Sequence, residues 1–426
     1  MGDRLPHGLE SRRDFLRYAS AAGLSIGVAG CSGNGNGGGD SGSGNGGDSG
    51  SGNGGDSSGD GGSGSDSGSN SPYSAENQEI VDNIDPKSLE PDELIGIGSK
   101  GFEPSSPETV ELSDAQLQEI EEMDAQTAIV FHYLKTAWVR LQRKGLTERF
   151  EDIGFSLEGV YGSEFDAEKQ ANIVETLAGK GSVDAITSRP LDANTTSGAF
   201  KTAADAGKDL VFMDDIPSGL NHPDDFASMV AADNRALGVI GGHVMAEFVG
   251  EGDIIMIGFG QAVKSVDERE SGFRETIEQY DGINIVEQVD FNDANKVQNK
   301  AANLMTANPQ AKGLWAPWDD PPGMQCVAAA KEQGKDPQEF HITTCDLGER
   351  SAQNMAEGGY IKGIGSQRPY DQGVSEANAI AQAVLGNETP PYIGVPALAV
   401  TRKNLLSAYE AVFKESPPEK LENQFN

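Results

Sequence analysis

The sequence has few basic residues for a chain of 426 residues. It contains 32 lysines and arginines against 67 aspartates and glutamates, which gives a formal net charge of −35. Nucleic-acid binding requires basic surfaces, so this balance argues against a nucleic-acid partner. The acidic excess is spread along the chain, and a self-repelling surface of this kind stays soluble where salt screens the repulsion. We therefore expect a halophilic protein, the alternative being a mildly acidic protein from an ordinary environment.

Cysteine is also scarce, with only Cys31, Cys326 and Cys345 in the whole chain. Cys326 and Cys345 are expected in a helix and at a strand end, where they form either one disulfide or two buried free thiols.

Residues 72–426 contain no C-x-x-C, H-E-x-x-H or G-x-S-x-G motif. His243 and Glu247 share a helix face, but two ligands do not make a metal site. We expect no metal, no cofactor and no enzymatic activity.

The chain has no apolar run long enough to span a bilayer, which takes roughly 20 residues. The longest candidate near the start, Tyr18–Ala29, is weakly apolar and follows the pair Arg12-Arg13. This pattern predicts a twin-arginine export signal over residues 1–30. Val28-Ala29-Gly30 places small residues before Cys31, so we expect cleavage there and a lipid on the Cys31 thiol. The alternative is an ordinary signal followed by an incidental cysteine.

Residues 32–71 contain only Gly, Ser, Asn and Asp. Such a segment has no apolar side chain to bury, so we expect a flexible tether over residues 31–71, with a root-mean-square span of about 35 Å. Residues 72–125 follow as a transition that prolines divide into turns. Ser113 and Gln116 predict a capping box and a short helix near its end.

From residue 126 onward, short apolar strands alternate with helices. This alternation predicts βαβ units and parallel sheets. The expected strands are 127–133, 155–161, 183–187, 209–213, 253–258, 283–289, 313–316, 340–345 and 361–366. The expected helices are 138–146, 167–178, 196–206, 235–248, 269–280, 294–306 and 322–333. So many strands favour two doubly wound lobes over a single sheet.

Ligands in such sheets bind at the carboxyl ends of the strands. The residues expected there combine aromatic rings, carboxylates, an arginine and an amide, which suits a neutral polyhydroxylated ligand. The stronger candidates are Trp138, Asp214, Arg269, Phe291, Trp318, Asp346 and Gln367, and the weaker ones are Lys135, Thr136, Asp215 and Asp319. Other interpretations remain open: Asp214 and Asp346 as helix caps, Arg269 as a surface ion pair opening its helix, the tryptophans as core residues, and Asp319-Asp320 as a cation site.

Several motifs occur in the order found in one known family. They are Asp166–Gln170, Val211–Asp215, Asp233-Asn234, Arg269–Phe273, Trp315–Asp319, Thr343–Asp346 and Gly365–Gly373. Over residues 126–410 the chain resembles the ribose/galactose-type sugar-binding proteins of ABC importers. The resemblance implies a periplasmic binding protein type I fold with a three-segment hinge. It implies one lobe from residues 126–232 and 367–395, a second from 233–366 and 396–412, and a tail from 413–426.

The same resemblance implies that Trp138 stacks on the sugar, that Asp214 holds its hydroxyl groups, and that the other five stronger candidates line the cleft. Asp215, Trp318 and Thr136 depart from the ribose-binding pattern, which favours a hexose or a pentopyranose. We expect a monomeric, extracellular, lipid-anchored receptor that delivers a neutral monosaccharide to an ABC permease. A sensory receptor feeding a chemoreceptor is the alternative. Asn194 and Asn387 stand in glycosylation sequons.

Overall fold

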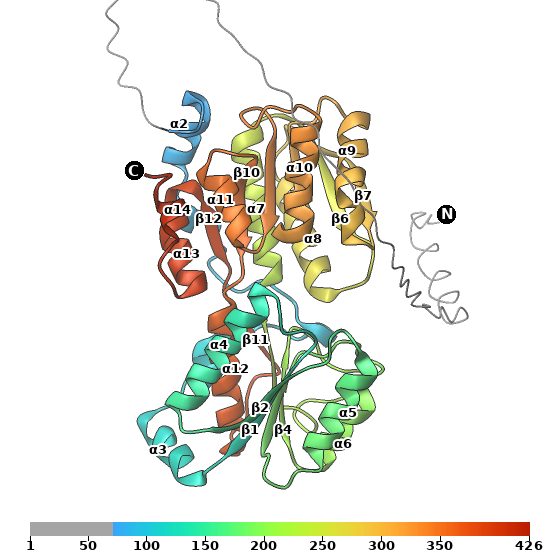
Figure 1. Cartoon of the computed structure of the whole chain (residues 1–426), viewed down its shortest axis with the longest axis vertical. Coiled ribbons are helices and arrows are strands. Elements are labelled where there is room, and N and C mark those ends of the chain that lie inside the picture. The colour runs from blue at the N-terminus through green and yellow to red at the C-terminus, as the bar shows by residue number, and fades with distance from the viewer. Residues whose placement is uncertain (1–70) are drawn as a thin grey trace, which may run out of the picture. The chain divides into compact units, whose positions relative to one another are not determined.

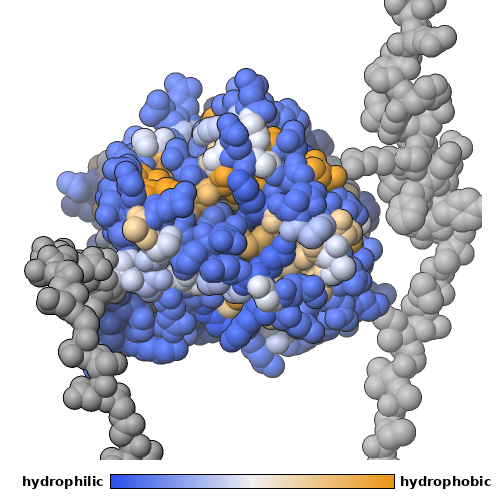
Figure 2. All heavy atoms as spheres, turned by 90° about the horizontal axis from the view of Figure 1, so that it is seen from above, coloured by the Kyte–Doolittle hydropathy of each residue, from blue (hydrophilic) through white to orange (hydrophobic). Residues whose placement is uncertain are grey.

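A computed structural model describes residues 71–426 of the chain (Figure 1). The export signal with Arg12 and Arg13, the lipidation at Cys31 and most of the tether lie outside these residues and stay predictions. Among the described residues, no helix is both long enough and apolar enough to cross a membrane. The face seen in Figure 2 is mostly hydrophilic, with small hydrophobic areas between polar residues.

One lobe is built on a six-stranded parallel sheet in the order β11-β5-β4-β3-β1-β2. Its strands are β1 Gln126–Phe131, β2 Ser156–Gly162, β3 Ala185–Ser188, β4 Asp209–Met213, β5 Ser228–Ala232 and β11 Tyr392–Val395. Helices α4 Ala137–Asp152 and α12 Pro369–Val384 pack on one face. Helices α5 Ala167–Ala178 and α6 Ser197–Asp205 pack on the other. Because both faces are covered, the central strands are largely buried and mostly apolar.

The second lobe repeats this plan with the order β12-β10-β9-β8-β6-β7. Its strands are β6 Gly252–Phe259, β7 Ile283–Phe291, β8 Gly313–Ala316, β9 His341–Cys345, β10 Ile361–Ser366 and β12 Leu398–Thr401, which alone pairs antiparallel. Helices α7 Asn234–Val249 and α8 Lys264–Ile277 cover one face. The other face carries α9 Val297–Ala307, α10 Met324–Glu332, α11 Glu349–Ala356 and α13 Leu405–Phe413.

The remaining elements are short and lie mainly before β1. They are α2 Ala75–Asn83, η1 Pro86–Leu89, η2 Ser99–Gly101, η3 Pro107–Val110, α3 Asp114–Met123, η4 Ala294–Lys296, η5 Asp319–Gly323, η6 Arg402–Asn404 and α14 Glu419–Glu422. The predicted capping box of Ser113 and Gln116 is present at α3. The segment 72–125 is therefore more ordered than its prolines suggested, with α2 as an unexpected helix.

Three expectations about this fold need correction. Strands β5, β11 and β12 were not anticipated. Arg269 does not open its helix, because α8 begins five residues earlier at Lys264 after Val263, a position that offers no side-chain cap. Phe291 is the last residue of β7 and does not follow it.

Of the two interpretations for Cys326 and Cys345, buried free thiols is the one found, and the two side chains lie in different core clusters.

Each lobe contains a pair of helices that touch through reciprocal glycines. A Cβ on Gly238 of α7 would lie 1.9 Å from the Arg269 carbonyl oxygen, and one on Gly272 of α8 would lie 2.1 Å from the Arg235 oxygen. In the other lobe, Gly145 of α4 and Gly373 of α12 approach each other's helix backbones in the same way. Only residues without a side chain permit such close approach, so these glycines set the positions of α4 and α8.

We predict that Gly238→Ala separates α7 from α8 and lowers the free energy of unfolding by about 1–3 kcal/mol, as overpacked cores do. The control is Gly198→Ala in helix α6, where a new Cβ would meet nothing within 4 Å. That variant should be neutral or slightly stabilising, because alanine favours helix. Denaturant unfolding in high salt measures both. Equal stabilities for the two variants would contradict the role given to Gly238.

Candidate ligand-binding site

Two aspartates occupy equivalent positions in the two lobes. Asp214 directly follows β4 and Asp346 directly follows β9, and their φ angles are 60° and 68°. Left-handed backbone is uncommon for residues other than glycine and often marks functional sites. Each aspartate donates its backbone N–H to a neighbouring strand, Asp214 to Val230 O and Asp346 to Gly365 O, both at 2.9 Å. The sheets therefore hold both carboxylates at their carboxyl edges. Neither is the cap of a helix.

A continuous polar network joins four of the predicted residues. The Trp138 indole Nε1 donates to Gln367 Oε1 at 3.2 Å, and Gln367 Nε2 donates to Asp346 Oδ1 at 2.8 Å. Asp346 Oδ2 accepts from the Arg269 guanidinium at 3.0 Å. Trp138 comes from α4 of the first lobe, whereas Asp346 and Arg269 come from the second. Gln367 stands between them, where the chain leaves β10 and passes to α12.

Arg269 is buried and is held by hydrogen bonds from its Nε and Nη1, so it is not a surface ion pair. Its Nε donates to Asn234 Oδ1 at 2.9 Å, and its Nη1 also donates to Pro317 O at 3.1 Å. Burial acts to lower the pKa of Arg269, but the Asp346 carboxylate and other nearby groups outweigh it, and the net pKa is raised. The guanidinium is therefore a fixed positive charge held in one orientation at the sheet edge.

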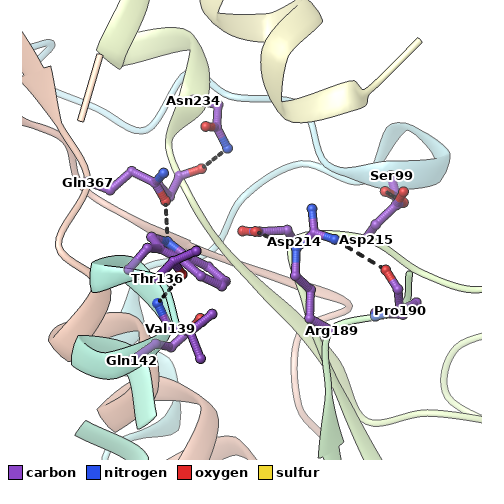
Figure 3. Close-up of polar contacts among 12 residues, drawn as sticks. Ser99, Thr136, Val139, Gln142, Arg189, Pro190, Asp214, Asp215, Asn234 and Gln367 are labelled. Atoms are coloured by element: carbon purple, nitrogen blue, oxygen red, sulfur yellow. Dashed lines mark hydrogen bonds and ion pairs between the residues drawn. The ribbon is translucent and has the colours of Figure 1, made fainter. Parts of the chain in front are cut away.

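Asp214 has an unused hydrogen-bonding capacity. Its side chain is 12% exposed and its Oδ2 lies 3.5 Å from Arg189 Nε, while its Oδ1 has no hydrogen-bond partner within residues 71–426. Figure 3 shows Arg189 and Asp214 pointing toward one another. Burial raises the pKa of Asp214, an effect that the positive charge of Arg189 opposes. A buried acceptor without a partner is costly, and a ligand hydroxyl group would satisfy it.

The aromatic candidates differ in what they expose. Trp318 is half-buried and its ring centroid lies 5.3 Å from those of both Phe259 and Phe291. Phe291 is 1% exposed and belongs to the core of its lobe. Within this cluster, Phe291 thus supports Trp318, and the half-buried rings of Trp318 and Phe259 offer the accessible surface. Trp138 is likewise half-buried.

The four weaker candidates have local structural partners. Thr136 caps α4 by accepting from the Val139 N–H, and Lys135 is exposed with its ammonium 5.8 Å from the Tyr133 ring. Asp215 accepts from the Ser99 hydroxyl and the Ile216 N–H. Asp319 accepts from Ser351 Oγ at 2.6 Å and from the Asp320 N–H at 2.7 Å. No group of acidic, histidine or cysteine side chains among the described residues is arranged to hold a metal ion.

Three residues of the site were not anticipated: Arg189, Asn234 and Ser99. Arg189 directly follows β3, so its position at the end of a strand could have identified it in the same way as the predicted site residues. Asn234 stands in the Asp233-Asn234 motif that supported the resemblance. Ser99 had no signal, because it reaches the site from the transition segment before the first strand.

The profile of the periplasmic binding protein domain matches residues 127–388. The chain belongs to this family. The family's type I fold has two α/β lobes with largely parallel sheets, as observed here. No curated protein matches the sequence.

Several solved structures of solute-binding proteins share the fold. One from Actinobacillus succinogenes, an ABC transporter protein with bound D-allose, is 22% identical with a TM-score of 0.59, covering 66% of this chain and 99% of its own. One from Agrobacterium vitis, bound to α-D-tagatopyranose, is 22% identical with a TM-score of 0.59 and covers 69% and 100%. One from Agrobacterium radiobacter, in complex with D-arabinose, is 20% identical with a TM-score of 0.58 and covers 68% and 99%.

The buried carboxylate of Asp319 gives a prediction about pH. Burial raises the pKa of Asp319 to about 7, and the nearby Asp346 carboxylate adds to this. Asp319 thus binds its proton more tightly in the folded state than in the unfolded one, so stability falls as the pH rises from about 4 to about 7. Between pH 5 and pH 7, the free energy of unfolding of Asp319→Asn should decline by about 2 kcal/mol less than that of the wild type. Unfolding curves at several pH values measure this.

The matched control for that experiment is Asp224→Asn, which changes an exposed carboxylate. It should leave the pH profile of stability parallel to that of the wild type. A profile for Asp319→Asn that is also parallel to the wild type would contradict the raised pKa.

Proposed function

We propose that this protein is the solute-binding component of an ABC importer and that it binds a neutral monosaccharide, a hexose or a pentose, between its two lobes. The observation that carries the proposal is Asp214 Oδ1 in one lobe, which has no hydrogen-bond partner in the described residues, with the Arg269–Asp346–Gln367 network of the other lobe at the corresponding sheet edge. The sugars bound by the solved structures of the same fold support this ligand class.

The chemistry of these groups fits a sugar ring. Carboxylate oxygens of Asp214 and Asp346 accept hydrogen bonds from hydroxyl groups, while Arg269 donates to hydroxyl oxygens. The Trp318 ring offers an apolar face for the C–H groups of the sugar. The carboxylates disfavour an anionic ligand. In this proposal Trp138 and Gln367 contact the same ligand, and Phe291 acts by holding Trp318 in place.

The mechanism follows from the division of the site between two lobes. A ligand that contacts both lobes stabilises the arrangement in which they close around it, and an ABC permease would recognise that arrangement. We place the lobe boundaries at residues 126–232 with 367–395 and at residues 233–366 with 396–412. The chain then crosses between lobes near Asp233, Gln367 and Pro396.

The same proposal includes the location of the protein. Export through the Arg12-Arg13 signal, a lipid on Cys31 and a tether over residues 31–71 would keep a monomeric receptor on the outer face of the cytoplasmic membrane. The tether's span of about 35 Å would let the receptor reach a permease in the same membrane.

Thermal unfolding of the full chain in molar salt, with a panel of neutral pentoses and hexoses, tests the proposal. A cognate sugar at 100 times its Kd should add about 2.7 kcal/mol to the free energy of unfolding and raise the Tm. Sugar acids and sugar phosphates should have no effect, because the site presents carboxylates. A panel in which no neutral sugar shifts the Tm would refute the monosaccharide assignment.

Two alanine variants locate the binding site in the same assay. Trp318→Ala should weaken binding about 10-fold, which corresponds to 1.4 kcal/mol, through loss of the stacking surface. Leu157→Ala is the control, since that side chain is 39% exposed and lies near the start of β2, at the end of the sheet opposite the strand ends that carry the proposed ligand contacts. An equal affinity for both variants would remove Trp318 from the site.

A further inference from the structure

Residues 94–105, here called the strap, lie before the region that matches the family profile. The solved structures cover almost all of their own chains but only two thirds of this one. The preceding segment is fixed to the second lobe, where Glu90 Oε1 accepts from the Ala399 N–H of β12 at 3.0 Å. The end of the strap is fixed to the first lobe, where Ser105 exchanges backbone hydrogen bonds with Tyr392 and Gly394 of β11.

The strap therefore crosses from one lobe to the other as a fourth connection. Its first contact on the way is a hydrogen bond from the Ile95 N–H to Asp233 Oδ2 at 2.7 Å. The Ile97 N–H then donates to Glu268 Oε2 of α8 at 3.3 Å. Finally, the Ser99 hydroxyl donates to Asp215 Oδ1, after β4 of the first lobe (Figure 3). Within five residues the strap binds three carboxylates on both lobes.

These three carboxylates share one property. Each belongs to the immediate sequence neighbour of a residue in the candidate site: Asp233 precedes Asn234, Glu268 precedes Arg269, and Asp215 follows Asp214. Asn234 in turn accepts from Arg269. The strap thus binds the side chains next to three residues of the site, and these hydrogen bonds leave the side chains of Asp214, Asn234 and Arg269 unused.

The strap also approaches the site closely. A Cβ on Gly96 would lie 2.9 Å from Asp233 Oδ1, and one on Gly98 would lie 2.8 Å from the Tyr392 ring. A small pocket is lined jointly by residues 96–99 of the strap and by Asp214, Asn234, Lys264, Ser265 and Glu268. Residues 96–99 therefore form a wall beside Asp214 and Asn234.

We propose that the strap is a working part of the ligand site: it closes the end next to Asp214, and through Ser99 and Ile97 it positions Asp214 and Arg269 for the ligand. This inference rests on the proposed function for its ligand, a neutral sugar. In this inference the role of Asp215 is to bind the strap, and Ser99 is a positioning residue. It also links the N-terminal part of the chain to the arrangement of the lobes, because opening them separates Glu268 from Asp215.

The test compares two serine-to-alanine variants of the full chain. Ser99→Ala removes the hydrogen bond to Asp215, whereas Ser88→Ala removes a hydroxyl that donates only to the nearby Asp85 O on the exposed surface. With the sugar identified by the panel, Ser99→Ala should raise the Kd about 5-fold and Ser88→Ala should leave it unchanged. Gly98→Ala, which pushes the strap away from Tyr392, should raise the Kd at least as much.

The alternative is a strap that only stabilises the fold. In that case Ser99→Ala and Gly98→Ala lower the Tm of the unliganded protein and leave the Kd at the wild-type value, which overturns the inference. Amide hydrogen exchange of the unliganded protein tests the strap independently of any sugar. Ser99→Ala should speed exchange at the Asp214 and Asp215 amides. If no sugar binds the wild type, the proposed function fails. Hydrogen exchange alone then tests the strap, and unchanged exchange rates at the Asp214 and Asp215 amides of Ser99→Ala would refute its role.

Discussion

The ion pair between the buried Arg269 and the half-buried Asp346 is the interaction on which the rest of the candidate site depends. It fixes a guanidinium from α8 against a carboxylate after β9, and Asn234 and the Pro317 carbonyl take further guanidinium hydrogens. Losing Asp346 would leave the buried Arg269 charge uncompensated, which costs about 3–5 kcal/mol. The other Asp346 oxygen accepts from Gln367, so the charge pair also orients the amide that contacts Trp138.

Close helix packing makes this geometry possible. Gly238 and Gly272 let α8 approach α7 until Arg269 reaches Asn234, and Gly145 and Gly373 allow α4, which carries Trp138, to approach α12 in the other lobe. The two lobes thus share one arrangement. In each lobe an aspartate with left-handed backbone directly follows a buried strand, and a pair of glycines lets two helices pack closely. What differs is the partner: Asp346 has Arg269 and Gln367, while Asp214 has Arg189 at one oxygen and no hydrogen-bond partner among residues 71–426 at the other.

Much of the fold was predictable because side-chain periodicity alone defines a buried strand or an amphipathic helix. The bounds of α5, β4, β8 and β10 agree with those expected. The start of α8 was not predictable, because Val263 offers no capping side chain. The candidate site was predicted as a set of strand-end residues, but their partners depend on which strands become neighbours. The strap was missed for the same reason, since its contacts with Asp233, Glu268 and Asp215 span more than 100 residues of sequence.

We propose that one sugar binds between Asp214 of the first lobe and the Arg269–Asp346 pair of the second, with its apolar face on Trp318. A crystal structure of the full chain with the sugar selected by thermal unfolding tests this most directly. The account predicts a ligand hydroxyl group within about 3 Å of Asp214 Oδ1, further contacts to Arg269 and Asp346, and the ring packed on Trp318. A sugar bound elsewhere, with Asp214 Oδ1 still unpartnered, would contradict it.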